Sequence, residues 1–269
     1  MRRLDEGLPQ GLKPGSVASW NVQAKACTHP RNNNAVKLIC MSIISGDRIR
    51  LVVFDLDGTL IDSQKDLAQS INAMLRHYGR HEQPDAVIKS YIGDGAQMLV
   101  RRALGDPAGD AADDAFVAEA FKFFVAYYHV HKLDHTYVYD GVFDALKAIR
   151  AARPEMKMAV LTNKPVNPSR AICAHFGLDA YFFQNYGGNS FHTKKPDPQG
   201  LETLIAEAGV SAAETVMIGD SDVDVLTAKN CGAWSVGCTF GLAPHTLAEA
   251  NPDALVDSPN EWPQALGIF

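Results

Sequence analysis

The sequence is poor in cysteine, and the few cysteines it has are not arranged as a site. There are five in 269 residues, an odd number, and no two have the Cys-x-x-Cys spacing of zinc and redox motifs. This pattern favours neither a disulfide framework nor a zinc centre. We therefore expect a soluble protein of the reducing cytoplasm, with its thiols free.

Long apolar runs and an excess of basic charge are missing as well. No uncharged apolar stretch approaches the roughly 18 residues of a membrane span, and residues 35–44 are interrupted by Lys37. Lys plus Arg number 25 against 31 for Asp plus Glu, a net charge of −6. Nucleic-acid backbones are bound by basic surfaces. We therefore expect neither a membrane nor a nucleic acid as partner.

Residues 1–47 differ in kind from the rest of the chain. They contain scattered Gly, Pro and Asn without sustained periodicity, and the basic side chains of residues 1–40 outnumber the acidic ones. This composition predicts a flexible N-terminal extension. Met41 directly precedes the first regular element, so we hypothesise that it is the biological start, or that the residues before it are dispensable.

Beyond residue 47, short apolar runs alternate with amphipathic stretches. Such runs are typical of strands buried on both faces of a parallel sheet. The predicted strands are residues 49–55, 157–162, 215–220 and 234–238, and the predicted helices are 142–152, 167–176, 198–208 and 223–230. The alternation predicts an α/β protein with a parallel sheet.

Residues 64–137 break this alternation, because they contain helical patterns and no strong strand run. The helices are expected at 66–78, 95–104 and 111–132. We therefore predict a helical insertion at 64–137 that divides a sheet domain made of residues 48–63 and 138–269.

Three of the predicted strands end in polar side chains: Asp55, Thr162 and Asp220. Parallel sheets bind ligands at the carboxyl ends of their strands. An acid directly after a buried strand is also costly unless it is paired or bound to a cation. The three positions therefore predict a common site at this edge of the sheet.

The first strand leads into two carboxylates, Asp55 and Asp57, followed by Gly58. Alternation along a strand places both acids on one face, and the glycine lets the backbone turn close to a ligand. Paired carboxylates can bind a hard divalent cation or divide nucleophilic and acid–base roles. A calcium loop is disfavoured, because it needs further acids nearby and no preceding apolar strand.

A second acidic cluster follows the third strand, with Asp220 and Asp224 four residues apart on one helical face. We interpret these two as metal ligands and Asp222 as a solvated residue of the helix start. Lys195 precedes a Pro-x-Pro turn, where it is either a surface lysine or a fixed ammonium that offsets the acids and binds a phosphate oxygen. Lys164 is interpreted as a surface or supporting residue.

The order Asp-x-Asp, Thr, Lys-Pro and Gly-Asp-x-x-x-Asp closely resembles the haloacid dehalogenase superfamily, over about residues 49–266. Within it, the chain is similar to the phosphoglycolate phosphatase family. The segments that carry this second likeness are Ile92-Gly-Asp-Gly-Ala, Tyr139-Asp-Gly-Val, Leu161-Thr-Asn-Lys-Pro and Lys194-Lys-Pro-Asp-Pro. One departure is Asn189, where an acid is expected. The resemblance implies a Rossmann-like parallel sheet core with a small all-helical cap inserted after the first strand.

The resemblance also implies a role for each site residue. Asp55 is the nucleophile, Asp57 the general acid and base, and Thr162 and Lys195 bind the transferring phosphoryl group. A bound Mg²⁺ is held by Asp55, by Asp57 through its carbonyl, and by Asp220, with Asp224 as a further metal residue supported by Ser221. The weaker substrate-binding candidates are Gly58, Asn163 and Arg102, of which Arg102 is either a carboxylate ligand or a surface helix residue.

The implied activity is Mg²⁺-dependent hydrolysis of a small phosphomonoester through an aspartyl-phosphate, with 2-phosphoglycolate as the expected substrate. Sugar phosphates, pyrophosphate and a sugar phosphomutase activity are alternatives, as is a non-enzymatic regulator of the same fold. A dehalogenase has no need of Asp57, which favours phosphoryl transfer. The expected partner is a small phosphorylated metabolite, and the expected state is a monomer or homodimer.

Overall fold

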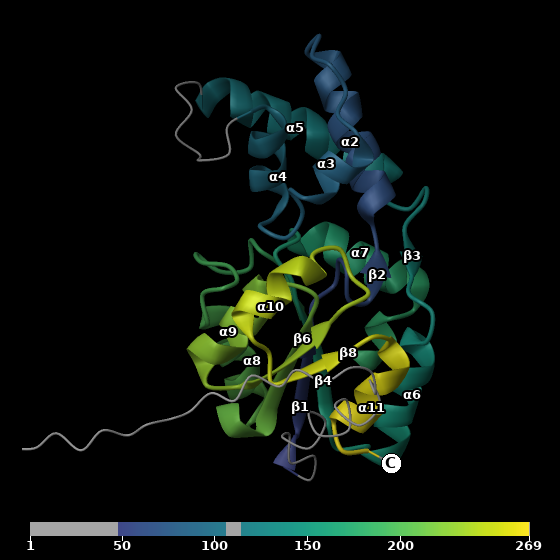
Figure 1. The fold of residues 1–269 in the computed structure, drawn as a ribbon, viewed down its shortest axis with the longest axis vertical. Coiled ribbons are helices and arrows are strands. Elements are labelled where there is room, and N and C mark those ends of the chain that lie inside the picture. Colours follow the sequence, from purple (N-terminus) through teal and green to yellow (C-terminus); the bar gives the residue numbers. More distant parts are fainter. Residues whose placement is uncertain (1–47, 106–113, 269) are drawn as a thin grey trace, which may run out of the picture. The chain divides into compact units, whose positions relative to one another are not determined.

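The computed structural model describes residues 48–105 and 114–268, whose largest sheet has six strands. Their spatial order is β5-β4-β1-β6-β7-β8, and every neighbouring pair is parallel. Figure 1 labels β1, β4, β6 and β8 of this sheet. The strands are β1 (Leu51–Phe54), β4 (Lys157–Leu161), β5 (Gln184–Tyr186), β6 (Thr215–Gly219), β7 (Trp234–Cys238) and β8 (Ala254–Val256). Strand β1 therefore lies between β4 and β6, and the carboxyl ends of these three parallel strands lie at the same edge of the sheet.

Strand β1 is the buried centre of the sheet, with all four of its residues inaccessible to solvent. Its register places Val53 opposite Ala159 of β4. Because successive side chains of a strand point to opposite faces, Val52 and Phe54 pack into one apolar cluster and Leu51 and Val53 into another. The continuous apolar run is thus explained by burial on both faces.

Helices cover each face of the sheet. The Phe54 face packs against α6 (Val142–Ala152), α7 (Val166–Phe176) and α11 (Trp262–Ala265), and the Val53 face against α8 (Gln199–Ala208) and α9 (Asp222–Cys231). The shorter elements are α10 (Leu247–Ala250), η2 (Asp179–Tyr181), η3 (Ala212–Glu214), η4 (Pro244–Thr246) and η5 (Pro259–Glu261). The predicted α/β fold with a parallel sheet is confirmed.

Between β2 (Ile61–Asp62) and β3 (Tyr137–Val138) the described residues form four helices, which we call the cap. They are α2 (Gln64–His77), α3 (Asp85–Lys89), α4 (Ala96–Ala103) and α5 (Asp114–His131). The cap has an apolar cluster of its own, in which Ile71 and Met74 of α2 pack with Val100 of α4 and Phe124 of α5. The short α3 has no counterpart among the predicted helices, because five residues are too few for a periodic pattern.

The two connections between the sheet domain and the cap are tied to each other. β2 and β3 pair as an antiparallel ribbon, with Ile61 opposite Val138. In the first turn of α2, the buried Asp66 carboxylate accepts hydrogen bonds from His135 N and from the backbone and hydroxyl of Thr136, at 2.7–3.1 Å. Asp66 thus fastens the start of the cap to the segment by which the chain leaves it.

We expect Asp66→Ala to destabilise the protein by about 3 kcal/mol, because it leaves the buried N–H and hydroxyl of Thr136, and the N–H of His135, without their acceptor. Urea unfolding followed by circular dichroism measures this loss. The matched control is Asp85→Ala, which removes an exposed carboxylate paired with Lys65 and is expected to cost less than about 1 kcal/mol. Equal losses in the two variants would contradict the role assigned to Asp66.

The predicted extension at residues 1–47, including Met41, lies outside the described residues. Within the described ranges, no helix is both long enough and apolar enough to cross a membrane. Cys173, Cys231 and Cys238 are free thiols.

Candidate active site

A pocket of about 660 Å³ opens beside the carboxyl ends of β1, β4 and β6, between these strand ends and the cap. Its polar lining includes Asp55 after β1, Thr162 after β4 and Asp220 after β6. The three strand-end residues predicted to share a site therefore do share one. The parallel register explains this, because neighbouring strands deliver their last residues to the same edge of the sheet.

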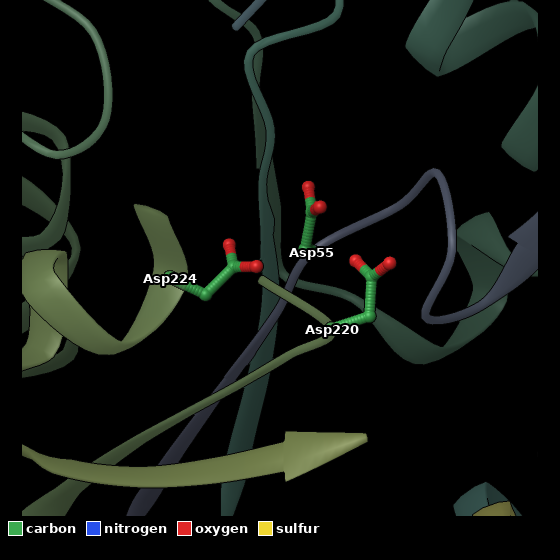
Figure 2. A group of neighbouring side chains, drawn as sticks. All are labelled: Asp55, Asp220 and Asp224. Atoms are coloured by element: carbon green, nitrogen blue, oxygen red, sulfur yellow. The ribbon is translucent and has the colours of Figure 1, made fainter. Parts of the chain in front are cut away.

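Asp55, Asp220 and Asp224 converge from three different segments (Figure 2). One carboxylate oxygen from each lies within 4.8 Å of the others. Asp55 is held at the end of β1 by its N–H, which donates to Ile218 O at 2.9 Å. Asp224 lies in the first turn of α9, where it forms a capping box with Ser221, whose hydroxyl donates to Asp224 Oδ2 at 2.7 Å.

Lys195 supplies a buried positive charge to this cluster. Its Nζ lies 2.8 Å from Asp55 Oδ1 and 2.6 Å from Asp224 Oδ1. Burial alone would lower the pKa of Lys195, but Asp224 and Asp55 outweigh it and raise the pKa above its ordinary value. Asn163 supports the lysine, because its Nδ2 donates to Lys195 O at 3.0 Å. The buried position excludes a surface lysine, and the binding of a phosphate oxygen by Lys195 stays a prediction.

The acidic cluster has the charge and the donor atoms of a divalent cation site. Burial, followed by the charge of Asp224, raises the pKa of Asp220 to about 8. Burial is also the largest cause that raises the pKa of Asp55 to about 6, against the lowering effect of Lys195. When all three are ionised, the carboxylates facing one ammonium leave two negative charges in excess, and carboxylate oxygens are the donors that hard cations prefer. These residues could therefore hold a metal ion.

Two glycines allow the backbone to approach Asp220 closely. A Cβ on Gly58 would lie 2.3 Å from Asp220 Oδ2, and a Cβ on Gly241 would lie 2.4 Å from Gly58 O. Gly58 also has φ +91°, which favours glycine. Asp220 Oδ2 accepts hydrogen bonds from the N–H groups of Leu242 and Ala243 at 2.6 and 3.0 Å. Gly58 was predicted to bind substrate. The structure places it against the Asp220 carboxylate and not in the pocket lining.

The side chain of Asp57 lies apart from the three-carboxylate cluster. Its Oδ1 accepts a hydrogen bond from Ser63 Oγ at 2.5 Å, and Lys164 Nζ lies 2.9 and 3.0 Å from its two oxygens. The metal role assigned to Asp57 concerns its backbone carbonyl, so the two acids two residues apart have different surroundings. This separation allows Asp55 and Asp57 to perform different chemical tasks.

Lys164 is the functional candidate that sequence reasoning missed, and a surface position for it is wrong. The residue is buried and lines the pocket. Burial would lower its pKa, but the Asp57 carboxylate and then Tyr128 raise it above the ordinary value. A signal was present, because Lys164 follows the strand-end residue Thr162 by two positions, at the same edge as the predicted site.

The remaining predicted residues are placed as follows. Thr162 and Asn163 line the pocket, and Asn163 Nδ2 also donates to Gly93 O of the cap at 3.1 Å. Arg102 is absent from the lining, because its guanidinium contacts Asp94 and donates to Tyr91 O at 3.0 Å. We correct its expected substrate contact to a structural one, which holds the loop between α3 and α4.

Comparison with known proteins agrees with this geometry. Residues 52–238 match the family model described as haloacid dehalogenase-like hydrolase. The chain belongs to this hydrolase family. The hydrolase is similar to the phosphoglycolate phosphatase of Pseudomonas putida, with 38% identity over 80% of this chain and 78% of that protein. The phosphoglycolate phosphatase of Vibrio parahaemolyticus is 35% identical to the hydrolase, over 82% of this chain and 97% of the Vibrio protein.

Solved structures give the same result for the fold. A predicted phosphoglycolate phosphatase from Haemophilus somnus has a TM-score of 0.74 and 30% identity, covering 80% of the hydrolase and 96% of that chain. CbbY from Rhodobacter sphaeroides, solved in complex with phosphate, has a TM-score of 0.63 at 23% identity and is similar in fold alone. The sequence-based identification of the family is confirmed.

The departure from the family pattern at Asn189 has a local explanation. Asn189 Oδ1 accepts a hydrogen bond from Val166 N at 2.8 Å, at the start of α7. A carboxylate oxygen would serve the same donor, so the amide preserves the contact and removes one negative charge from the rim of the pocket.

The cap provides the apolar wall of the pocket. The lining residues from the cap include Leu67, Leu99, Phe121, Phe124 and Tyr128. The rings of Phe124 and Tyr128 stack with centroids 5.8 Å apart. These aromatic side chains therefore both pack the cap and face the pocket. Such a wall excludes water from the polar strand ends.

Proposed function

We propose that this hydrolase is a phosphatase of small phosphomonoesters whose substrate is 2-phosphoglycolate, which it converts to glycolate and phosphate. The observation that carries the proposal is the division between the two acids: Asp55 lies in the lysine-paired acidic cluster, and Asp57 lies against Lys164. A nucleophile and a separate acid–base group are what phosphoryl transfer through a covalent intermediate needs. The relatives named phosphoglycolate phosphatase confirm a phosphoric monoester hydrolase and support this substrate.

In the proposed first step, the Asp55 carboxylate attacks phosphorus and the bond from phosphorus to the ester oxygen breaks. The Asp57 carboxyl gives its proton to the departing oxygen, so that an alcohol leaves and not an alkoxide. In the second step, Asp57 removes a proton from the water that attacks the aspartyl-phosphate. The Thr162 hydroxyl and the Lys195 ammonium bind the phosphoryl oxygens, where negative charge accumulates.

The metal is Mg²⁺ in this proposal, held by Asp55, Asp220 and the backbone carbonyl of Asp57. Asp224 and Ser221 orient the cluster, because both Asp224 oxygens already accept hydrogen bonds from protein groups, Lys195 and Ser221. When bound, Mg²⁺ neutralises the carboxylates and the phosphate, and this allows one anion to approach another.

We expect Mg²⁺ to raise the melting temperature more at about pH 9 than at about pH 6. The raised pKa of Asp220, about 8, means that the folded metal-free protein binds more protons than the unfolded chain between about pH 4 and pH 8. Its stability therefore falls as the pH rises through this range, and a cation that replaces the protons restores it. At about pH 9, Mg²⁺ is expected to raise the melting temperature by about 5 °C or more.

Differential scanning fluorimetry with Mg²⁺ or with a chelator measures this difference. Asp220→Asn is expected to lose the Mg²⁺-dependent increase at both pH values. Equal increases at the two pH values in the unmodified protein would argue against cation binding at the buried carboxylates.

A panel of phosphomonoesters assayed for phosphate release tests the proposed substrate. It contains 2-phosphoglycolate, sugar phosphates, pyrophosphate and p-nitrophenyl phosphate, each with and without Mg²⁺. The proposal expects the highest kcat/KM for 2-phosphoglycolate. A higher kcat/KM for a sugar phosphate or pyrophosphate would make that compound the substrate in place of 2-phosphoglycolate. Isomerisation without phosphate release would indicate a mutase. No turnover of any compound would indicate a regulator.

The proposal places the hydrolase in the cytoplasm, acting on a free metabolite with neither nucleic acid nor membrane as partner. The net charge of −6 supports this, because neither phosphate backbones nor anionic lipids attract an acidic protein. A monomer or a homodimer is proposed for its assembly, which light scattering distinguishes.

A further inference from the structure

The contact between Lys164 and Asp57 joins three parts of the protein at one buried point. Lys164 lies in the loop after β4, and its side chain is 4% exposed. Its Nζ contacts both oxygens of Asp57, which belongs to the turn after β1. The same Nζ lies 4.8 Å from the ring centroid of Tyr128, on helix α5 of the cap. The ammonium is thus shared by the strand-end loops and the cap.

The Asp57 carboxylate is held from two sides. Ser63 Oγ donates to Oδ1 from the segment that leads into the cap, and Lys164 lies against both oxygens. An exposed ion pair would leave the carboxylate free to rotate, but here both partners are largely excluded from water. Burying an ammonium costs several kcal/mol unless it is paired. The geometry of this pair is therefore fixed by the fold.

Tyr128 makes the position of Lys164 depend on the cap. A cation over an aromatic face is attracted by the ring, more so where water is excluded. The Tyr128 ring is itself held by stacking on Phe124 in the apolar wall of the pocket. A change in the position of α5 would therefore be transmitted to the Lys164 ammonium and, through it, to Asp57.

We propose that Lys164 is a positioning residue that holds the Asp57 carboxyl at the leaving-group oxygen and makes this placement depend on the cap. The proposal rests on the acid–base role of Asp57 in the proposed function. Lys164 acts through Asp57, so its contribution is largest when the departing oxygen needs a proton. A leaving group that is stable as an anion departs without that proton and is affected less.

Two substrates of nearly the same shape distinguish a leaving group that needs a proton from one that departs as a stable anion. Phenyl phosphate releases a phenolate that is strongly basic, whereas the nitro group of p-nitrophenyl phosphate stabilises the departing anion. The formation of each phenol is followed in a single turnover with enzyme in excess, so that the first chemical step alone is measured. Both compounds lack a carboxylate, so the comparison does not depend on 2-phosphoglycolate being the physiological substrate.

For Lys164→Met we expect a loss of about 30-fold with phenyl phosphate and about threefold with p-nitrophenyl phosphate. The ratio of the two rates in one preparation is independent of the folded fraction, so partial misfolding of the variant does not change it. In Lys164→Arg the ratio of the phenyl phosphate rate to the p-nitrophenyl phosphate rate is expected to lie between the values for Lys164→Met and the unmodified protein, because the charge and donors of the arginine still reach Asp57. Tyr128→Leu is expected to lower the same ratio, as Lys164→Met does, but by a smaller factor.

The matched control is Lys65→Met, which removes a lysine from an exposed Lys–Asp pair of 3.0 Å on the cap and should leave the ratio unchanged. Equal losses for both substrates in Lys164→Met would overturn the proposal. So would an increase in KM confined to 2-phosphoglycolate, because it would make Lys164 a carboxylate ligand. An unmodified protein that releases neither phenol from these two compounds nor phosphate from 2-phosphoglycolate would instead refute the proposed function itself.

Discussion

Asp55→Asn is expected to lower phosphate release by at least about 10⁴-fold, because an amide cannot form the aspartyl-phosphate. The loss should be seen in kcat at saturating Mg²⁺ and should be the same for every phosphomonoester that the protein hydrolyses. The fold should remain intact, since the amide fills the same space at the end of β1. Rapid acid quench with ³²P-labelled substrate should detect a labelled protein for the parent and none for the variant.

The matched control is Asp222→Asn, which removes a carboxylate between Asp220 and Asp224 that is not itself part of the cluster with Asp55. It should keep the parental kcat within about twofold. Circular dichroism and the melting temperature establish that each variant is folded. Turnover by folded Asp55→Asn at the parental rate would exclude nucleophilic catalysis by this residue.

Lys195→Ala is expected to reduce both stability and activity. The variant leaves Asp55 and Asp224 buried without the ammonium that lies 2.8 and 2.6 Å from them. Removing one partner of a buried ion pair typically costs about 3–5 kcal/mol. The loss of a cation at the phosphoryl oxygens should lower kcat/KM by about 100-fold or more.

Chemical denaturation measures the first effect, and assays at a temperature where the variant is folded measure the second. Mg²⁺ should recover part of the stability, because it supplies positive charge to the same carboxylates. Lys147→Ala is the control, since this exposed lysine lies 3.9 Å from Asp144. Parental kinetics in Lys195→Ala across a range of Mg²⁺ concentrations would contradict the assigned role.

The sheet and the strand-end residues could be predicted because both follow from simple regularities. Continuous apolar runs such as Leu51–Phe54 are required where both faces of a strand are covered. The convergence of Asp55, Thr162 and Asp220 follows from parallel pairing of neighbouring strands. Strand β5 was not predicted, because its residues Gln184–Tyr186 are polar and only partly buried at the edge of the sheet.

The contacts of single side chains were harder to predict. Lys164 and Asp57 are 107 positions apart. The place of Lys164 two residues after Thr162 suggests that it lies near the site, but no local pattern identifies Asp57 as its partner. Arg102 was expected at the substrate, but the path of the loop between α3 and α4 brings Asp94 to its guanidinium. In both cases the partner is determined by loop conformation, which hydrophobic periodicity does not encode.

The ribbon of β2 and β3 has a consequence for how this protein can change. Because the two strands pair directly, the whole cap enters and leaves the sheet domain at one point. A different insertion with the same paired ends would leave the register of the six-stranded sheet untouched, and with it Asp55, Thr162 and Asp220. Evolution or an engineer can therefore exchange the leaving-group pocket as a cassette while the hydrolytic machinery is retained.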